Sequence, residues 1–486
     1  MLSSPRSVGI SVRCFSFFLL SCFSLNSPSL ISLLPQPSHF SKLPVEVIIH
    51  IIDLAKQQHD QDLQSYEQAL LPSTPRINPV LALSHVCRLF NSAATSTSTL
   101  WTSLYLDGEL DGTRAEEKAL FWSGKASQRV NRTQGRTERG SGGIATLVLT
   151  RIQHWTDDYL SLLCESLDLL QQVRLQRCFL TWTGTSASSD ESQQLQNVFR
   201  LLKSSSSTLL HLTLYTSAHL RILFSLSRLG HTFTGLTTVD LRSCNMKYPS
   251  TDAYLLPAFL PRFEGERDWH PLSKLSTLIL VHPIWRLRFR DGTVASPTID
   301  PADVPALRIA RLGPTTPPVS WNLFSSSSIT DLTIEDQLDH PRQEDPDLST
   351  SLPALESLSM IRSPSLTTRF FDLAIKLELH FPHLTRLDLN SATLSQSFLD
   401  LFSSSRAPLL DSLRLDNTTS TTGSALSIPL FEAVRVLSVL GVNWLSTDFL
   451  KGVGQTMPRL EHLHASIWDV EKDLVDLPKT VALHYD

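Results

Sequence analysis

The chain has 486 residues, of which 41% are hydrophobic and 18% are charged. This hydrophobic content excludes a wholly disordered chain, and the length allows about two to four domains or one long repeat array. The 42 Lys and Arg residues are nearly balanced by 47 Asp and Glu residues, so the net charge of -5 favours neither nucleic acid nor an acidic membrane as the main partner. The 6 cysteines include no CxxC pair, which argues against a disulfide scaffold and against a zinc ribbon.

Residues 1–41 form a leader with a basic and then apolar layout. Arg6 and Arg13 precede the apolar stretch Cys14–Leu25, as in a signal peptide, but no small-x-small cleavage site follows cleanly. Extended to Leu34, the stretch reaches the roughly 20 residues that span a membrane, at the cost of including several polar residues. Three interpretations remain open: a signal or anchor, an unstructured leader, and an extension that is not part of the working protein.

Residues 42–106 are expected to form a small helical module with an inserted loop at 57–79. The first helix opens at Leu43-Pro44, because proline is tolerated in a first turn. A second amphipathic helix is expected over Leu81–Ala94, and a short apolar segment follows at Leu104–Leu106. These elements carry more aliphatic surface than they can bury among themselves, so they need a partner or a neighbouring domain.

Three short motifs in this module resemble the F-box, especially its fungal F-box-like form. The motifs are LPxE at Leu43–Glu46, VCRxF at Val86–Phe90 and the closing pair Leu100-Trp101. The resemblance implies binding to the Skp-type linker subunit of a cullin-RING ubiquitin ligase. The linker-binding residues that it implies are Leu43, Pro44, Val47, Ile48, Ile51, Ile52, Val86, Cys87, Phe90 and Trp101. The family usually has a short loop where this chain has its insertion, and an ordinary helical hairpin that caps the next domain remains the alternative.

Residues 107–143 are expected to hold a helix and a basic, flexible linker. Between Gly124 and Gly143, five Lys and Arg residues accompany a single Glu and almost no apolar residues, so this stretch cannot fold on its own. A tail that touches nucleic acid or an import receptor is one interpretation. No aromatic residues interleave the charges, as stacking on single strands requires, and we therefore expect a solvated linker.

The remaining chain, residues 144–486, repeats a six-residue frame with apolar residues at positions 1, 4 and 6. The frame starts at residues 144, 170, 209, 236, 275, 304, 329, 355, 384, 410, 434 and 460, and nine of the eleven intervals are 24 to 29 residues long. The sixth frame is Val304, Leu307 and Ile309. A few buried leucines at about 1.5 to 3 kcal/mol each do not offset an ordering cost of roughly 1 to 2 kcal/mol per residue. A single repeat is therefore not stable on its own, whereas a stack of repeats is.

This frame resembles the leucine-rich repeat, LxxLxLxx(N/C)xL, in the cysteine-containing form found behind F-boxes. Cys178 and Cys244 occupy the cysteine position in two units, although two buried cysteines placed by coincidence are the alternative. The expected fold class is α/β: a small α-helical F-box followed by a leucine-rich-repeat solenoid of about 12 units, a horseshoe with a parallel concave sheet and helices outside. Helical patterns between the frames occur at Tyr159–Leu167, Leu195–Leu202, Phe370–Leu377, Phe398–Phe402 and Phe449–Val453.

The neighbours of the frame residues are expected to line the concave face, because side chains alternate along a strand. The predicted target-binding residues are Arg174, Tyr215, Asp240, Arg242, Arg386, Asp388, Arg414, Asp416, His462 and His464. A polar surface of mixed sign suits recognition of a protein or peptide, and only a few of its members are expected to carry the binding energy. The two histidines lack a further ligand nearby in the sequence, so no metal site is expected.

No catalytic motif is present: GxxxxGK[ST], HExxH and GxSxG do not occur. We therefore expect no enzymatic activity and no cofactor. The resemblance to the F-box and to the leucine-rich repeat implies a cytoplasmic or nuclear substrate-recognition subunit of an SCF-type (cullin-RING) E3 ubiquitin ligase. It would bind the Skp-type linker through the F-box and an unknown protein through the repeats, without nucleic acid or membrane. Two alternatives stay open, a leucine-rich-repeat scaffold without a ligase role and a secreted recognition protein with sequons at Asn131 and Asn417.

Overall fold

The computed structural model divides into two compact units, residues 1–208 and residues 209–486, which are described separately. It describes residues 43–64, 79–107, 114–127, 144–150, 172–178, 193–216, 233–242, 272–281, 287–288, 294–295, 304–313, 328–335, 354–421, 426–427, 429–444, 447–465 and 482–484. The leader, the helical pattern at 159–167 and Cys244 lie outside these ranges. Within them, no helix combines the length and the apolar character needed to cross a bilayer.

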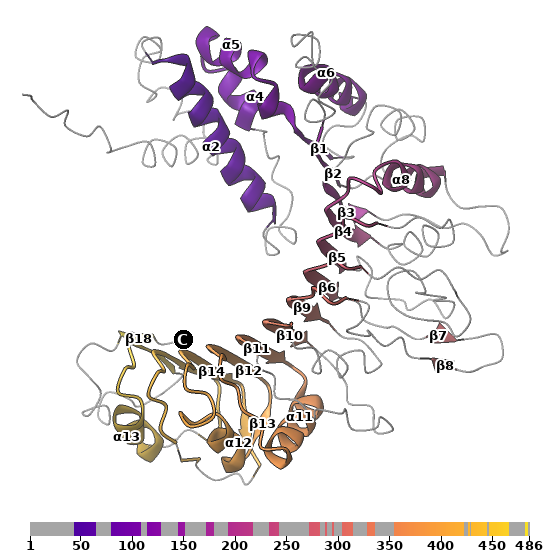
Figure 1. The fold of residues 1–486 in the computed structure, drawn as a ribbon. Coiled ribbons are helices and arrows are strands. Elements are labelled where there is room, and N and C mark those ends of the chain that lie inside the picture. Colours follow the sequence, from indigo (N-terminus) through magenta and orange to yellow (C-terminus); the bar gives the residue numbers. More distant parts are fainter. Residues whose placement is uncertain are drawn as a thin grey trace, which may run out of the picture. The chain divides into compact units, whose positions relative to one another are not determined.

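The first unit begins with a helical module (Figure 1). Its elements are α2 (Val45–Gln64), α4 (Pro79–Ser84), α5 (Arg88–Ser96) and the 3-10 segment η3 (Ser98–Trp101). The helix α2 continues into the stretch that was expected to be a loop, so that prediction was wrong for residues 57–64. The polar residues of its last turns are compatible with a helix, and Gln57 Nε2 donates to Asp53 Oδ2 at 2.8 Å across one turn.

The expected helix over Leu81–Ala94 is in fact two helices with a break between them. The Ser84 hydroxyl donates to the Leu81 carbonyl at 2.7 Å, and Val86 N donates to Leu83 O at 3.0 Å, which ends α4. Cys87 is extended, with φ of -160°, and is the N-cap residue of α5. Apolar spacing alone did not locate this break, because the spacing continues across it while the serine bonds locally to the backbone.

The first unit continues with three parallel strands and two helices. The strands are β1 (Ser103–Asp107), β2 (Thr146–Thr150) and β3 (Gln172–Cys178), and the helices are α6 (Ala115–Ser127) and α8 (Gln193–Ser204). Leu104 pairs with Leu147, and Leu147 pairs with Val173. The short apolar segment that closes the helical module is therefore the first strand of a parallel sheet.

The second unit is a parallel-sheet solenoid, as the sequence predicted. Its strands follow one another in space in the order β4 (His211–Thr216), β5 (Thr238–Arg242), β6 (Thr277–Val281), β9 (Ile309–Leu312), β10 (Asp331–Glu335), β11 (Ser357–Ile361), β12 (Arg386–Asn390), β14 (Ser412–Asp416), β16 (Val436–Val439), β17 (His462–Ala465) and β18 (Ala482–His484). Every neighbouring pair in this series is parallel. Two small pairs are separate from it: β13 (Thr393–Leu394) with β15 (Thr419–Ser420), and β7 (Leu287–Arg288) with β8 (Val294–Ala295).

Helices pack on one side of the later strands of this unit. They are α11 (Pro364–Lys376), α12 (Gln396–Leu401) and α13 (Thr447–Thr456), and Figure 1 shows all three on the same side. The rings of Phe371 and Phe398 meet edge to face, with centroids 4.4 Å apart, and Phe381 stacks on Phe402 at 5.0 Å. Such aromatic pairs add to the burial of the frame leucines. The helical patterns at 195–202, 370–377, 398–402 and 449–453 are thus confirmed.

One backbone contact recurs between successive repeats and marks the repeat frame. The carbonyl at frame position 2 accepts the N–H groups at positions 2 and 3 of the next repeat; Leu210 O, for example, accepts Thr237 N at 2.8 Å and Thr238 N at 3.1 Å. The same contact occurs at the carbonyls of Thr237, Ser276, Arg308, Thr330, Glu356, Thr385, Asp411 and Arg435. In the first unit Thr102 O accepts Ala145 N and Thr146 N, so a frame already begins at Trp101.

This contact corrects the sixth frame by three residues. The expected members were Val304, Leu307 and Ile309, but the carbonyl that bonds to the next unit belongs to Arg308, so the frame starts at Leu307. Its position 4 is Ala310, which is 1% exposed, whereas Ile309 is 42% exposed. The sequence pattern selected the wrong frame because alanine is a weaker apolar signal than the adjacent isoleucine.

A left-handed residue follows four consecutive long strands of the second unit. The residues are Arg362, Ser391, Asn417 and Gly441, with φ between 51° and 62°. Three of them donate their N–H to the next repeat: Arg362 to Asn390 O at 2.8 Å, Ser391 to Asp416 O at 3.1 Å, and Asn417 to Leu440 O at 2.6 Å. The turns after β11, β12 and β14 are thus each bonded to the next repeat, which offsets the cost of the left-handed backbone there.

Candidate functional site

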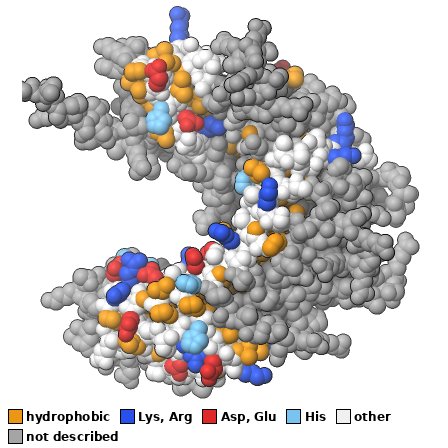
Figure 2. Space-filling view, in the orientation of Figure 1, with side chains coloured by type: hydrophobic (Ala, Val, Ile, Leu, Met, Phe, Trp, Pro, Cys, Tyr) orange, Lys and Arg blue, Asp and Glu red, His pale blue; other side chains and the backbone are white. Residues whose placement is uncertain are grey.

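The helical module exposes apolar side chains at the beginning of α2. Val45 is 40% exposed and Val47 is 38% exposed, and Pro44 beside them is also exposed. Figure 2 shows hydrophobic side chains gathered over this end of the helix. Exposed apolar side chains that lie together are the usual mark of a protein-binding surface. Of the predicted linker-binding residues, Pro44 and Val47 are therefore the most exposed.

Most of the other predicted linker-binding residues form the core of the module. Residues Ile48, Ile51, Ile52, Phe90 and Trp101 are each at most 6% exposed, whereas Leu43, Val86 and Cys87 are half-buried. The indole of Trp101 donates to Ala94 O at 2.7 Å. These side chains hold the helices together, and their helical spacing in the sequence could not distinguish this role from a binding role.

The helix α6 packs on the module through an aromatic contact that sequence reasoning missed. Trp122 is 1% exposed, its ring centroid lies 4.7 Å from that of Trp101, and its Nε1 donates to Ser103 O at 3.0 Å. Phe121, next in the chain, also meets Trp101 edge to face at 5.3 Å. Adjacent aromatic residues in an otherwise polar segment were the only available signal of this contact.

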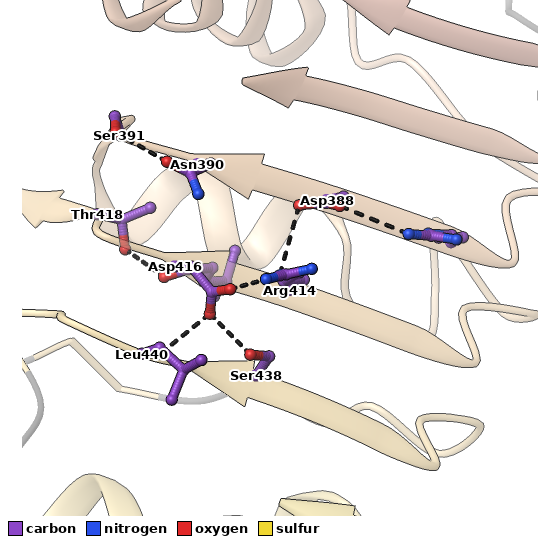
Figure 3. Close-up of polar contacts among 10 residues, drawn as sticks. Asp388, Asn390, Ser391, Arg414, Asp416, Thr418, Ser438 and Leu440 are labelled. Carbon is purple, nitrogen blue, oxygen red and sulfur yellow. Dashed lines mark hydrogen bonds and ion pairs between the residues drawn. The ribbon is translucent and has the colours of Figure 1, made fainter. Parts of the chain in front are cut away.

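On the second unit, the open strand face is formed by frame positions 3, 5 and 7, which alternate with the buried leucines. Figure 2 shows acidic, basic and histidine side chains interspersed on the visible part of this unit. Four predicted target-binding residues, Arg386, Asp388, Arg414 and Asp416, come together with Ser438 on the adjacent strands β12, β14 and β16 (Figure 3). We call these five residues the polar cluster.

Asp416 is the most buried member of the polar cluster and the best satisfied. It is 2% exposed. Its Oδ1 accepts the Ser438 hydroxyl at 2.7 Å and Leu440 N at 3.0 Å, and its Oδ2 accepts Arg414 Nε. The bond to Asp416 is the main cause of the raised pKa of Arg414. This carboxylate links β14 to β16 and orients the arginine at the same time.

Asp388 is surrounded differently, although it lies on the same face. Its side chain is 10% exposed, and its ion pairs are longer, 3.6 Å to Arg386 Nη2 and 4.0 Å to Arg414 Nε. Burial raises the pKa of Asp388, and the two arginines offset this rise only in part. The Asp388 carboxylate therefore separates two guanidinium groups without fully neutralising either.

The remaining predicted target-binding residues do not join this cluster. Tyr215 and Asp240 are half-buried on β4 and β5, His462 is exposed on β17, and His464 pairs in register with Ser438. Arg174 lies on β3 in the first unit and Arg242 at the end of β5, but their side chains are outside the described residues. No three His, Cys, Asp or Glu side chains gather into a metal-binding set in the described parts of the chain.

An ion pair between Arg311 and Glu335 on β9 and β10 also belongs to the open strand face and was missed. Arg311 pairs in register with Ile279 and Thr333. The expected sixth frame, with Leu307 and Ile309 as its inward positions, would put the residue between them, Arg308, in this row instead, because that frame was assigned three residues too early. The correct signal was the hydrogen-bond ladder, which a sequence pattern does not reveal.

Of the comparisons with known proteins, a family model matches part of the first unit. No curated protein matches the chain. Among solved structures, the crystal structure of the Rad7 and Elc1 complex in yeast is similar over 98% of each chain, with 13% identity and a TM-score of 0.36. Residues 40–107 match the family model described as F-box-like. The chain thus consists of a small helical F-box-like region followed by a parallel-sheet solenoid.

Proposed function

We propose that this chain is the substrate-recognition subunit of an SCF-type (cullin-RING) E3 ubiquitin ligase, acting in the cytoplasm or nucleus. The observation that carries the proposal is the F-box-like match over residues 40–107, which folds as a helical module with exposed Val45 and Val47. F-box domains bind Skp-type linker subunits. In this proposal the exposed start of α2 contacts the linker, and buried Ile48 and Ile52 keep the helix in place.

The second part of the proposal concerns the solenoid, which we propose to be a leucine-rich-repeat array that holds the target protein on its open strand face. The repeating frame, the parallel strands and the helices on one side support this assignment. The chain would carry out no bond chemistry. It would raise the effective concentration of the target's lysines near a ubiquitin-charged enzyme elsewhere in the assembly.

The linker contact is tested by co-expression of the chain with a Skp-type linker. Replacing Val45 and Val47 together by aspartate puts charge into the proposed contact without touching the core, so we expect the amount of co-purified linker to fall at least tenfold. Substitution of Trp101, by contrast, would unfold the module, because its side chain is 1% exposed.

A matched control uses Leu409 and Leu430, which are 49% and 46% exposed on the second unit. Replacing both by aspartate adds the same charge and should leave linker recovery within twofold. If the wild-type chain recovers no linker under conditions that recover it with another F-box protein, the proposal is wrong. The leucine-rich-repeat scaffold without a ligase role would then be the better description.

A further inference from the structure

The polar cluster presents positive charge to solvent although its formal charges cancel. The side chains of Arg386 and Arg414 are 58% and 48% exposed, while those of Asp388 and Asp416 are 10% and 2% exposed. The two carboxylates are thus much less accessible to a ligand than the arginine side chains that contact them. An approaching group therefore meets the two guanidinium groups first.

Arg414 is held in one orientation and keeps donors for a ligand. Both of its carboxylate contacts, to Asp416 and at 4.0 Å to Asp388, are made by Nε. These contacts leave the N–H groups of Nη1 and Nη2 unused. Because Asp416 also accepts the Ser438 hydroxyl and Leu440 N, it cannot easily move with the arginine. The guanidinium group is thus oriented before any ligand arrives, which lowers the entropy cost of binding.

A second guanidinium group lies beside the first. Arg386 contacts the other oxygen of Asp388, at 3.6 Å, so the same carboxylate is flanked by both arginines. Planar guanidinium groups match the geometry of oxygen pairs on carboxylates and phosphates. A basic ligand side chain is disfavoured here, because it would have to pass the two exposed cations to reach a buried acid.

We infer that the polar cluster binds an oxyanion, a carboxylate or a phosphate, carried by a segment of the target protein, with Arg414 as the principal contact and Arg386 as the second. The inference rests on the proposed function, since it names the chemistry that the target would present to the solenoid. It assigns target recognition to β12, β14 and β16 among the many strands of the second unit.

The test uses the purified full-length chain and a library of random 12-residue peptides in which serine is replaced by phosphoserine in half of the members. We expect wild-type protein to retain peptides enriched at least threefold in Asp and Glu, in phosphoserine, or in both. Enrichment in Asp and Glu alone identifies a carboxylate ligand, and enrichment in phosphoserine alone identifies a phosphate. No enrichment in any anionic residue overturns the inference.

The variant that decides the question is the double substitution Arg414→Gln with Asp416→Asn. It removes the arginine without leaving a charged carboxylate buried and alone. We expect the anionic enrichment to disappear and the affinity of the best wild-type peptide to fall at least tenfold. Arg414→Lys keeps the charge but loses the planar fork, and should weaken that peptide at least threefold. Unchanged enrichment in the double variant would contradict the inference.

The matched control is Arg435→Gln, on the frame position before β16. Arg435 is also about half exposed, at 52%, and pairs with Asp411, but it lies outside the cluster and its carboxylate is 37% exposed. Peptide affinity should stay within twofold. Linker recovery measured on the same samples separates the two proposals: lost anion preference with intact linker binding affects only this inference, and the reverse affects only the proposed function.

Discussion

Two aspartates on neighbouring strands show how much a side chain's neighbours decide its energetic role. Asp416 receives three hydrogen bonds, from Ser438, Leu440 N and Arg414, and so its charge is compensated inside the protein. Asp388 is nearly as buried but has only long ion pairs, to Arg386 and Arg414. The difference predicts opposite consequences for removing the two charges.

Asp388→Asn should not destabilise the protein at pH 7. Burial raises the pKa of Asp388 above its ordinary value of 3.8, so the folded state binds this proton more tightly than the unfolded state. The stabilisation that follows is complete below the ordinary pKa and is lost as pH rises through the folded pKa. Asparagine imitates the protonated form, so the variant's free energy of unfolding should equal or exceed that of wild type at pH 7.

Urea unfolding at several pH values checks this prediction. The difference between Asp388→Asn and wild type should shrink as the pH falls from 7 through the folded pKa toward 3.8, because below that value wild type is protonated in both states. Glu461→Gln removes a carboxylate that is 54% exposed and should stay within about 0.5 kcal/mol of wild type throughout. A loss of stability for Asp388→Asn at pH 7 would mean that its ion pairs outweigh its burial.

The residue scale is also where sequence reasoning reached its limit. Alternation along the strands correctly placed Asp388 and Arg414 on the same face as their neighbours. It could not show that the acids are buried and the arginines exposed, because that depends on side chains one repeat away. It also could not separate the buried Ile48 and Ile52 from the exposed Val47, since all three fit a helical stripe.

At the scale of elements, the turns after the strands set a strict requirement at Gly441. Its φ is 62°, and a Cβ built there would collide with Asn417 Oδ1. Gly452 in α13 is the opposite case, with open space around a Cβ. The same substitution should therefore have opposite effects at the two positions, through backbone strain in one and chain entropy in the other.

Gly441→Ala is expected to lower the free energy of unfolding by about 1 to 3 kcal/mol. Gly452→Ala should raise it by roughly 0.5 to 1 kcal/mol, because alanine favours a helix interior. Thermal and urea unfolding of both single variants measures the contrast. Equal effects of one sign would show that the left-handed backbone at Gly441 and its closeness to Asn417 do not restrict this position as described.

Helices and strands were predicted well where an apolar pattern repeated along the chain. They were predicted poorly where one local contact determined the boundary of an element. Every expected frame has a strand at or beside it, because the apolar period is reinforced across many units. The break before α5 depends on local bonds of Ser84 and Val86, and the sixth frame depends on an alanine in place of a larger residue. No periodicity contains that information.

At the scale of the whole molecule, the proposed linker and target contacts lie on different compact units. A substitution that abolishes one contact should therefore leave the other contact intact. The variant with aspartate at Val45 and Val47 should keep its anionic peptide preference, and the Arg414→Gln, Asp416→Asn variant should keep linker recovery.

Reconstituted ubiquitin transfer combines both contacts in one measurement. The reporter is a protein fused to the best peptide from the library, and each of the two variants should reduce its modification at least tenfold. Because the two contacts are independent, the combined variant should reduce modification by about the product of the two single effects, down to the background measured without the chain. Full activity of either single variant would show that its contact is not needed for transfer.

The strand β1 has a consequence for how the F-box-like region can be handled. Residues 103–107 lie within the F-box-like match and also pair along β2, where Leu104 meets Leu147 and Leu106 meets Leu149. Removal of residues 1–107 would leave β2 as an unpaired edge strand, which is prone to self-association. The F-box-like region is thus not an independently transferable domain, and its transfer to another protein would need to include β2.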